Sequence, residues 1–184
     1  MSLRSLPVAV LAVLAACGGA RDNISLPDMK LPTYGSKTGS SLASCPTVKC
    51  LTVYVAPWCG YCRAATPLIL ALRDNLKKLK VDTRIIVGLD EPEPVEAYAR
   101  AFGPDTMLDL NNSLRLSGVP HFYVSDASGS ILKELSGYPS GVETPEEFAS
   151  VLELPYQSAS APNPPERKPP ADAKKAKTRK SRGG

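Results

Sequence analysis

Apolar residues in the middle of the chain alternate between two periodicities. Leu51–Val55 and Arg84–Leu89 are short apolar runs, rich in β-branched residues, and are typical of buried strands. Between them, residues 64–79 place leucines at helical spacing, at Leu68, Leu72, Leu76 and Leu79. This order predicts two parallel strands that are joined by a helical crossover.

The second half of the pattern predicts a helix, a hairpin and a closing helix. Residues 94–102 favour a helix, and an irregular stretch follows to Ser117. The apolar runs 119–124 and 131–135 are joined by Asp126-Ala127-Ser128-Gly129, which is typical of a hairpin turn. Thr144-Pro145-Glu146-Glu147 has the residues of a capping box, so we expect a helix that ends near Leu154. The order predicts an α/β domain with a central mixed sheet flanked by helices.

Composition limits the folded part to the middle of the 184-residue chain, whose length argues for one domain. Residues 17–44 are rich in Gly, Ser, Pro and Thr, which predicts a flexible tether with at most a short strand near residues 24–29. Residues 156–184 are rich in Pro and Lys and offer no apolar face, which predicts disorder. We therefore expect one domain over residues 45–155 with disordered ends.

The first residues have the pattern of a secretory signal. Arg4 precedes an apolar stretch, residues 6–16, that is too short to span a bilayer as a mature helix. Leu14-Ala15-Ala16-Cys17 resembles the lipobox of bacterial lipoproteins, which implies cleavage after residue 16 and acylation of Cys17. The alternative is an ordinary signal peptide followed by an incidental cysteine. The lipobox resemblance implies an envelope protein that faces the periplasm on a lipid anchor, and Gly18 slightly favours the outer membrane.

Basic charge is concentrated in the last 29 residues. From Tyr156 onward there are eight Lys or Arg against Glu166 and Asp172, a net charge of +6. The whole chain carries +4, so the remainder sums to −2. The charge therefore gives no indication that the domain binds nucleic acid. The tail either contacts anionic lipid or cell-wall polymer, or only adds solubility.

Cys59 and Cys62 form a C-x-x-C pair in a position where a helix begins. This spacing brings two thiols within bonding reach and exposes the first to the positive end of the helix dipole. Thiols in such motifs have pKa values of about 3.5 to 7.5, against about 8.5 for free cysteine. We expect Cys59 to attack a substrate disulfide as a thiolate and Cys62 to resolve the mixed disulfide.

The residues around this pair resemble the active site of thioredoxins and protein disulfide isomerases. Ala56-Pro57-Trp58-Cys59-Gly60-Tyr61-Cys62 matches the active-site segment, Pro67 the helix-kinking proline, Gly118-Val119-Pro120 the cis-proline loop, and Gly137 a later glycine. The resemblance covers about residues 51–154 and implies a thioredoxin fold. It also implies supporting roles for Trp58, Gly60, Tyr61 and Pro120, and a substrate groove that includes Val119 and His121. For His121, a structural role is the alternative to one in the groove.

Two departures limit what the resemblance implies. Thioredoxins have a buried acid six residues before the first active-site cysteine, where this chain has Val53. Cys62 would then need water or another base for its proton. The dipeptide Gly60-Tyr61 is the one found in periplasmic disulfide isomerases, but those proteins also carry a dimerisation domain that this chain lacks room for. The direction of the redox chemistry therefore stays open.

Cys45 and Cys50 form a second pair with a wider spacing. At about 3.3 Å per residue, the strand that follows Cys50 would hold this pair about 20 Å from Cys59, too far for one metal to bind both. An envelope protein would most often oxidise such a pair to a structural disulfide, and a second redox site is the alternative.

These observations predict a thiol–disulfide oxidoreductase, a reductase or an isomerase, that acts on cysteine-containing envelope proteins. It would use an unidentified electron donor and no metal or cofactor beyond its redox-active disulfide. A partner-binding module without catalysis and a metal-handling protein are the alternatives.

Overall fold

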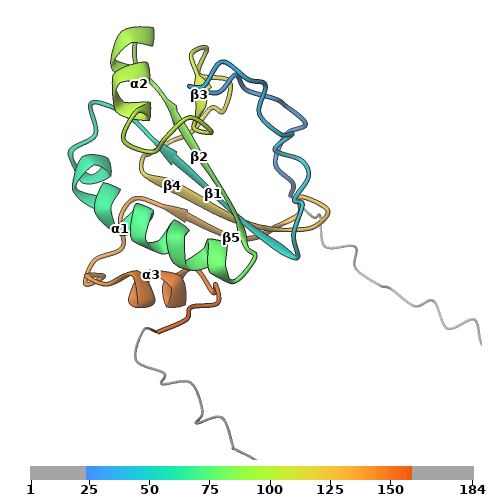
Figure 1. The fold of residues 1–184 in the computed structure, drawn as a ribbon. Helices are drawn as coiled ribbons and strands as arrows, with labels where there is room; N and C mark the ends of the chain where they lie inside the picture. Colours follow the sequence, from blue (N-terminus) through green and yellow to red (C-terminus); the bar gives the residue numbers. More distant parts are fainter. Residues whose placement is uncertain (1–23, 159–184) are drawn as a thin grey trace, which may run out of the picture.

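The computed structural model describes residues 24–158, whose centre is a five-stranded mixed sheet in the order β3-β2-β1-β4-β5 (Figure 1). The elements in chain order are β1 (Lys49–Val55), α1 (Gly60–Lys78), β2 (Asp82–Gly88), α2 (Pro92–Ala99), β3 (Met107–Asp109), β4 (His121–Asp126), β5 (Ile131–Ser136) and α3 (Pro145–Val151). β1 pairs with β2 in parallel and with β4 antiparallel, and β4 and β5 form the expected hairpin. The predicted α/β class and mixed sheet are confirmed.

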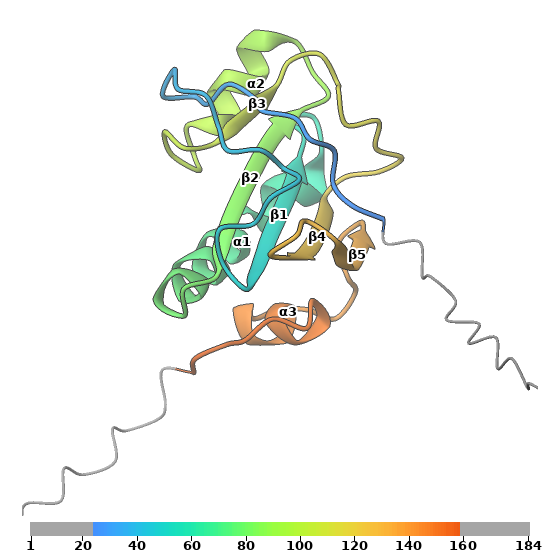
Figure 2. The same ribbon diagram turned by 90° about the vertical axis from the view of Figure 1, so that its right-hand side faces the viewer.

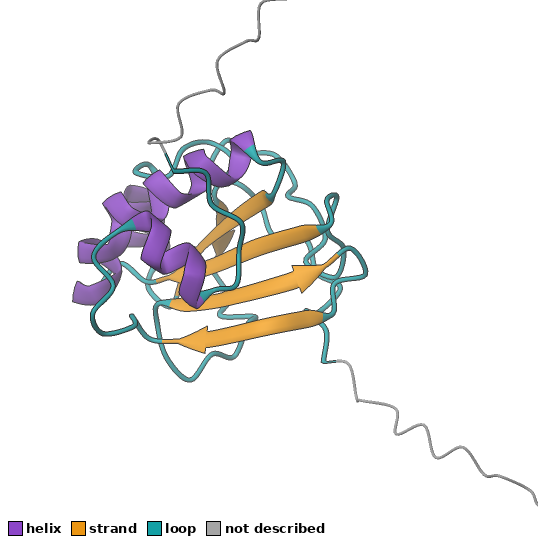
Figure 3. Cartoon of the chain, turned by 90° about the horizontal axis from the view of Figure 1, so that it is seen from below, coloured by secondary structure: helices purple, strands orange, loops and turns teal. Residues whose placement is uncertain are grey.

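The alternation of side chains along β1 separates two hydrophobic cores. Leu51, Val53 and Val55 face the core that contains the buried residues of all three helices described. Tyr54 faces a second core on the other side of the sheet. Figure 3 shows the helices gathered on one side of the strands. We call these sides the helix face and the strap face.

The strap face is covered by residues 24–44, which we call the N-terminal strap (Figures 1 and 2). Leu26, Leu31 and Leu42 are buried there against side chains of the sheet. The strap also donates and accepts backbone hydrogen bonds along β3, including Leu108 N–H to the Pro32 carbonyl at 2.8 Å. For residues 24–44, the expectation of a flexible tether is therefore wrong, because tertiary burial of three leucines outweighs a loop-like composition.

Gly129 shows how closely the strap packs on the hairpin turn. The residue has a φ of 81°, a conformation that favours glycine, and a Cβ at this position would collide with the carbonyl of Ala43. Near it, Ser25 forms a single antiparallel bridge with Ser130, in place of the short strand considered for residues 24–29.

Several element boundaries differ from the sequence expectations. β3 was not expected, and its three residues are too short to show a periodicity. α1 begins at Gly60, and α2 begins at Pro92, because a proline is favoured in the first helical turn. At the C-terminal end, Gln157 N–H donates to Asn75 Oδ1 at 3.0 Å, so the ordered chain passes slightly beyond the expected limit of residue 155. The signal segment, Cys17 and the tail from residue 159 lie outside the described residues.

The capping box predicted at Thr144 is present at the start of α3. Glu147 Oε2 accepts the backbone N–H groups of Glu143 and Thr144 at 2.9 and 3.1 Å, and these bonds hold the pKa of Glu147 below its ordinary value of 4.5. A carboxyl whose folded-state pKa is lowered stabilises the fold above its unfolded pKa, and this stability is lost as pH falls through the folded value.

We therefore expect Glu147→Gln to be less stable than the parent at neutral pH and to lose less stability as the pH falls below about 4.5. Urea unfolding at a series of pH values measures this. Glu146→Gln, in the same turn but outside the capping box, is the matched control. Parallel pH profiles for the parent and Glu147→Gln would contradict the expectation.

Candidate active site

The N-terminus of α1 positions the Cys59–Cys62 pair. Cys59 is the N-cap residue, and its Sγ accepts the backbone N–H of Cys62 at 3.1 Å. The two cysteines are joined as a disulfide with a Cα–Cα distance of 5.2 Å, and their exposures are 4% and 0%. Because the unpaired N–H groups of the first helical turn point towards Cys59, a thiolate at this sulfur would be stabilised after reduction.

The loop before β4 lies against the same sulfur. The Val119–Pro120 peptide bond is cis, and the Val119 carbonyl oxygen lies 3.6 Å from Cys59 Sγ. Residues 118–120 and Cys59 are about 60 positions apart in the chain, and the pairing of β1 with β4 brings them together. The structure thus places the expected proline loop beside the redox pair.

Two large aromatic side chains surround the pair on the surface. Trp58 is 58% exposed and Tyr61 is 74% exposed, although both are large and partly apolar. Gly60 lies between the cysteines, and a Cβ at this position would meet no atom within 4 Å. Trp58 and Tyr61 therefore present exposed aromatic surface next to the cysteines in the sequence.

Sequence reasoning missed the contacts that hold Trp58. The indole N–H donates to the Leu89 carbonyl at 2.7 Å, and the Leu89 N–H donates to Asn112 Oδ1 at 2.9 Å. These bonds connect Trp58, through Leu89, to the segment that follows β3. No sequence signal could have identified Leu89, because its contribution is made by backbone atoms.

Asp109, at the end of β3, organises the same segment. Its carboxylate accepts the N–H groups of Ser113 and Leu114 at 2.8 and 3.1 Å and the hydroxyl of Tyr54 at 3.0 Å. Burial, with the charge and hydrogen bond of Asp109 as further causes, raises the pKa of Tyr54 above its ordinary value. Tyr54 therefore stays protonated and acts as a donor that fixes this carboxylate.

At the position where thioredoxins have a buried acid, Val53 is fully buried in the same core as Cys62. The buried acid Asp109 and the buried His121 occupy strand positions that face the strap side, away from the core that contains Cys62. His121 is 3% exposed, and its Nε2 lies 2.8 Å from Glu134 Oε1. This buried position favours a structural role for His121 over contact with a substrate.

Cys45 and Cys50 form a disulfide at the opposite end of β1, with a Cα–Cα distance of 5.7 Å. Among residues 24–158, no group of three or more His, Cys, Asp or Glu is arranged to hold a metal ion. Within the same range, no helix is both long and apolar enough to cross a membrane.

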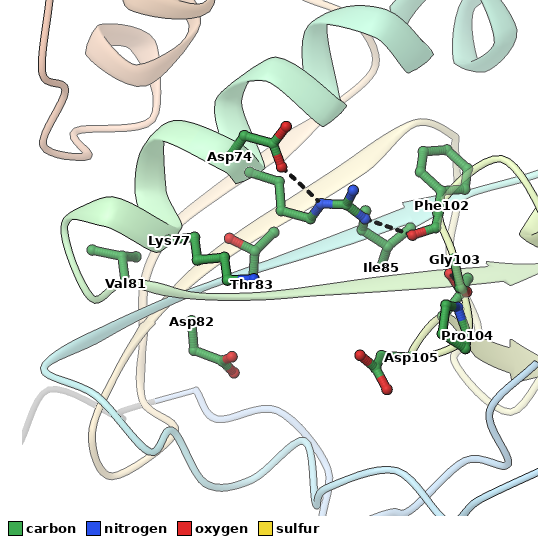
Figure 4. Close-up of a pocket in the computed structure, with 12 residues that line it drawn as sticks. Asp74, Lys77, Val81, Asp82, Thr83, Ile85, Phe102, Gly103, Pro104 and Asp105 are labelled. Carbon is green, nitrogen blue, oxygen red and sulfur yellow. Dashed lines mark hydrogen bonds and ion pairs between the residues drawn. The ribbon is translucent and has the colours of Figure 1, made fainter. Parts of the chain in front are cut away.

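A separate cavity of about 470 Å³ lies between the second half of α1, β2 and residues 102–106 (Figure 4). Arg73 lines it and donates to the Phe102 carbonyl at 2.6 Å. None of the four cysteines in the described residues lines this cavity. It is therefore distinct from the redox pair.

Comparisons with solved structures agree with this fold. A surface-exposed lipoprotein thioredoxin from Streptococcus pneumoniae superposes with a TM-score of 0.56 at 15% identity, covering 69% of this chain and 98% of the other. A secreted disulfide oxidoreductase from Mycobacterium tuberculosis, described as homologous to E. coli DsbE, gives a TM-score of 0.53 at 12% identity, covering 68% and 95%. The chain has a thioredoxin fold.

Other neighbours with the thioredoxin fold are also thiol–disulfide oxidoreductases. One is a proposed protein disulfide isomerase from Bacteroides thetaiotaomicron, with 28% identity, a TM-score of 0.55 and coverage of 71% of this chain and 85% of the other. No protein-family model and no curated protein sequence matches this chain. The resemblance stated from the sequence is thus confirmed at the level of the fold, with thiol–disulfide oxidoreductases as its structural neighbours.

Proposed function

We propose that this protein is a thiol–disulfide oxidoreductase that reduces or isomerises disulfides of cell-envelope proteins through Cys59 and Cys62. The observation that carries the proposal is the 3.1 Å hydrogen bond from the Cys62 N–H to Cys59 Sγ at the start of α1. This donor and the helix dipole favour a thiolate at the first cysteine, which is the attacking species in disulfide exchange.

In the reductive direction, the Cys59 thiolate attacks one sulfur of the substrate disulfide and releases the other as a thiolate. Cys62, one helical turn deeper and fully buried, then attacks Cys59 Sγ and releases the second substrate thiol. Two electrons pass to the substrate, and Cys59 and Cys62 end as the disulfide. With Val53 in place of an acid, the proton of Cys62 leaves through water or through the departing substrate thiolate.

The surface beside Cys59 supports a polypeptide substrate. Exposed Trp58 and Tyr61 offer apolar contacts, and the carbonyl of Val119 in the proline loop lies 3.6 Å from Cys59 Sγ. We also propose that Cys17 carries a lipid anchor on the periplasmic side of the envelope. The lipobox-like sequence at residues 14–17 supports this, and the secreted and lipoprotein neighbours make such a location consistent with the fold.

A mixed-disulfide trap tests the proposal. We expect full-length Cys62→Ser, incubated with insulin as a disulfide-containing probe, to accumulate a covalent adduct at Cys59, because the serine cannot resolve it. The matched control is Cys59→Ser/Cys62→Ser, which removes the attacking thiol as well. Non-reducing electrophoresis and peptide mass spectrometry measure the adduct, and equal adduct in the two variants would refute the assignment of Cys59 as nucleophile.

A further inference from the structure

A buried guanidinium lies on the sulfur of Cys50, far from the Cys59–Cys62 pair. Arg84 projects from β2, its side chain is 3% exposed, and its Nη2 lies 3.3 Å from Cys50 Sγ. Arginine stays protonated in proteins, so this sulfur faces a permanent positive charge that solvent barely screens. A disulfide needs no such partner, whereas a thiolate would be stabilised by it.

Arg84 is held in this position by the N-terminal strap. Nη1 donates to the carbonyls of Ser41 and Leu42 at 3.0 and 3.2 Å, and Nη2 also donates to the carbonyl of Ser44. These oxygens are uncharged, so they fix the orientation of the guanidinium without neutralising it. The positive charge is therefore preorganised at the disulfide.

A buried hydroxyl without a partner belongs to the residue that is paired with Cys50 across the sheet. Ser125 on β4 is directly opposite Cys50 in the antiparallel register, so the two side chains share the strap face. The Ser125 hydroxyl is fully buried and makes no hydrogen bond with any described residue. A buried unpaired hydroxyl is costly, and a thiolate on its cross-strand partner Cys50 would provide a charged acceptor to which the hydroxyl could turn.

Asp82 is the one carboxylate close to this sulfur, and it opposes a thiolate. Its Oδ2 lies 3.7 Å from Cys50 Sγ and 3.3 Å from Arg84 Nε. The Asp82 side chain is 34% exposed, so water screens its charge more than that of Arg84. Asp82 forms an ion pair with Arg84 Nε, but Arg84 Nη2 is nearer to the sulfur, at 3.3 Å, than Asp82 Oδ2 is.

The two sulfurs differ in access. Cys50 is fully buried, whereas Cys45 is 7% exposed, more than the 4% of Cys59 in the oxidised active site. Val48, inside the small loop that the disulfide closes, is 85% exposed and offers an apolar contact to a partner. An approaching thiolate therefore reaches Cys45 first, and the sulfur it would displace is the one beside Arg84.

We propose that the Cys45–Cys50 disulfide is a second thiol–disulfide exchange centre, which accepts two electrons from a dithiol. A thiolate of the dithiol attacks Cys45 Sγ, and the electron pair of the broken bond goes to Cys50 Sγ, which is held as a thiolate by Arg84 and Ser125. The second thiol of the dithiol loses its proton to solvent and, as a thiolate, attacks the dithiol sulfur of the mixed disulfide. Cys45 is released as a thiolate that takes up a proton, and the dithiol becomes a disulfide.

This centre works separately from the Cys59–Cys62 pair. β1 runs from Lys49 to Val55 between the two disulfides, and at about 3.3 Å per residue it separates them by about 20 Å. Direct exchange between them within one molecule is therefore excluded in this conformation. The inference does not rest on the proposed function, because it concerns different cysteines at the other end of the sheet.

The test uses the full chain with Cys59→Ser/Cys62→Ser, so that only the second pair exchanges. The protein is equilibrated with graded ratios of reduced to oxidised dithiothreitol, and thiol blocking with peptide mass spectrometry gives the reduced fraction at Cys45 and Cys50. We expect Arg84→Met to raise the ratio needed for half-reduction by about tenfold or more, and Arg84→Lys to raise it less. Ser125→Ala should shift it in the same direction, while exposed Arg100→Met is the matched control.

Half-reduction ratios for Arg84→Met and Ser125→Ala within about twofold of the parent would overturn the proposal. Circular dichroism shows whether Arg84→Met is folded. If Arg84→Met is not folded, two other measurements test the proposal. They are the half-reduction ratio of Ser125→Ala and the ultraviolet thiolate absorbance of the reduced parent. The reduced parent should carry more thiolate at neutral pH than the same protein with Cys50→Ser, and equal absorbance would overturn the assignment of Cys50.

Discussion

Replacing Cys59 with serine is expected to lower the rate of disulfide reduction by at least about a hundredfold, because a serine hydroxyl cannot supply the attacking thiolate. The fold should be unaffected, since Cys59 is the N-cap residue of α1 and serine is a favoured N-cap. Reduction of insulin by dithiothreitol, with the full chain as catalyst, measures the rate.

The matched control is Cys45→Ser/Cys50→Ser, which removes the disulfide at the other end of β1. Insulin reduction by this variant should stay close to the parent rate, provided that it is folded by circular dichroism. If Cys59→Ser retained the parent rate, the proposed catalytic function would fail, whereas the inference about Cys50 and Arg84 would stand or fall on its own titration.

Leu42→Ala is expected to lower the free energy of unfolding by about 2 to 5 kcal/mol, the usual range for truncating a buried leucine. Leu42 is fully buried in the core of the strap face, where it packs with residues of β1, β2 and the strap itself. Urea unfolding of the oxidised protein measures the loss. If residues 17–44 were a freely moving tether, Leu42→Ala would hardly change the free energy of unfolding.

Leu132→Ala is the matched control, because it truncates a leucine that is not buried. Leu132 is on β5 and is 53% exposed, so its truncation should change the free energy of unfolding by about 0.5 kcal/mol or less. Similar small losses for Leu42→Ala and Leu132→Ala would show that the strap contributes little to stability in solution.

The regular elements could be predicted because their apolar residues repeat with a clear period, as in Leu51–Val55 and residues 64–79. The strap could not, because Leu26, Leu31 and Leu42 follow neither a helical nor a strand period. Their burial depends on β3 and on the hairpin turn at Gly129, which are distant in sequence. β3 itself is only three residues long and pairs on its outer side with the strap.

Some residues of the candidate site could likewise be predicted from the sequence, and others could not. Cys59, Cys62 and Pro120 belong to short motifs that carry their own signal, so the sequence places them before any contact is known. Leu89 and Asn112 support Trp58 through a backbone group and a loop side chain, for which no motif exists. Arg84 is a charged residue at the start of a buried apolar run, which is a weak indication of a special role. Its contact with Cys50 could not be predicted, because the two residues are 34 positions apart in the chain.

The strap also limits how far the redox pair could stand from a membrane. If Cys17 carries a lipid, a tether that extended to residue 44 would reach about 95 Å at full extension. Since the strap is already bridged to the hairpin at Ser25, the span between Cys17 and the packed strap is at most eight residue steps, or about 28 Å at full extension. A domain held by so short a tether would stay within a few tens of ångströms of the lipid surface. Its substrates would then be proteins that are themselves at the membrane or that pass close to it.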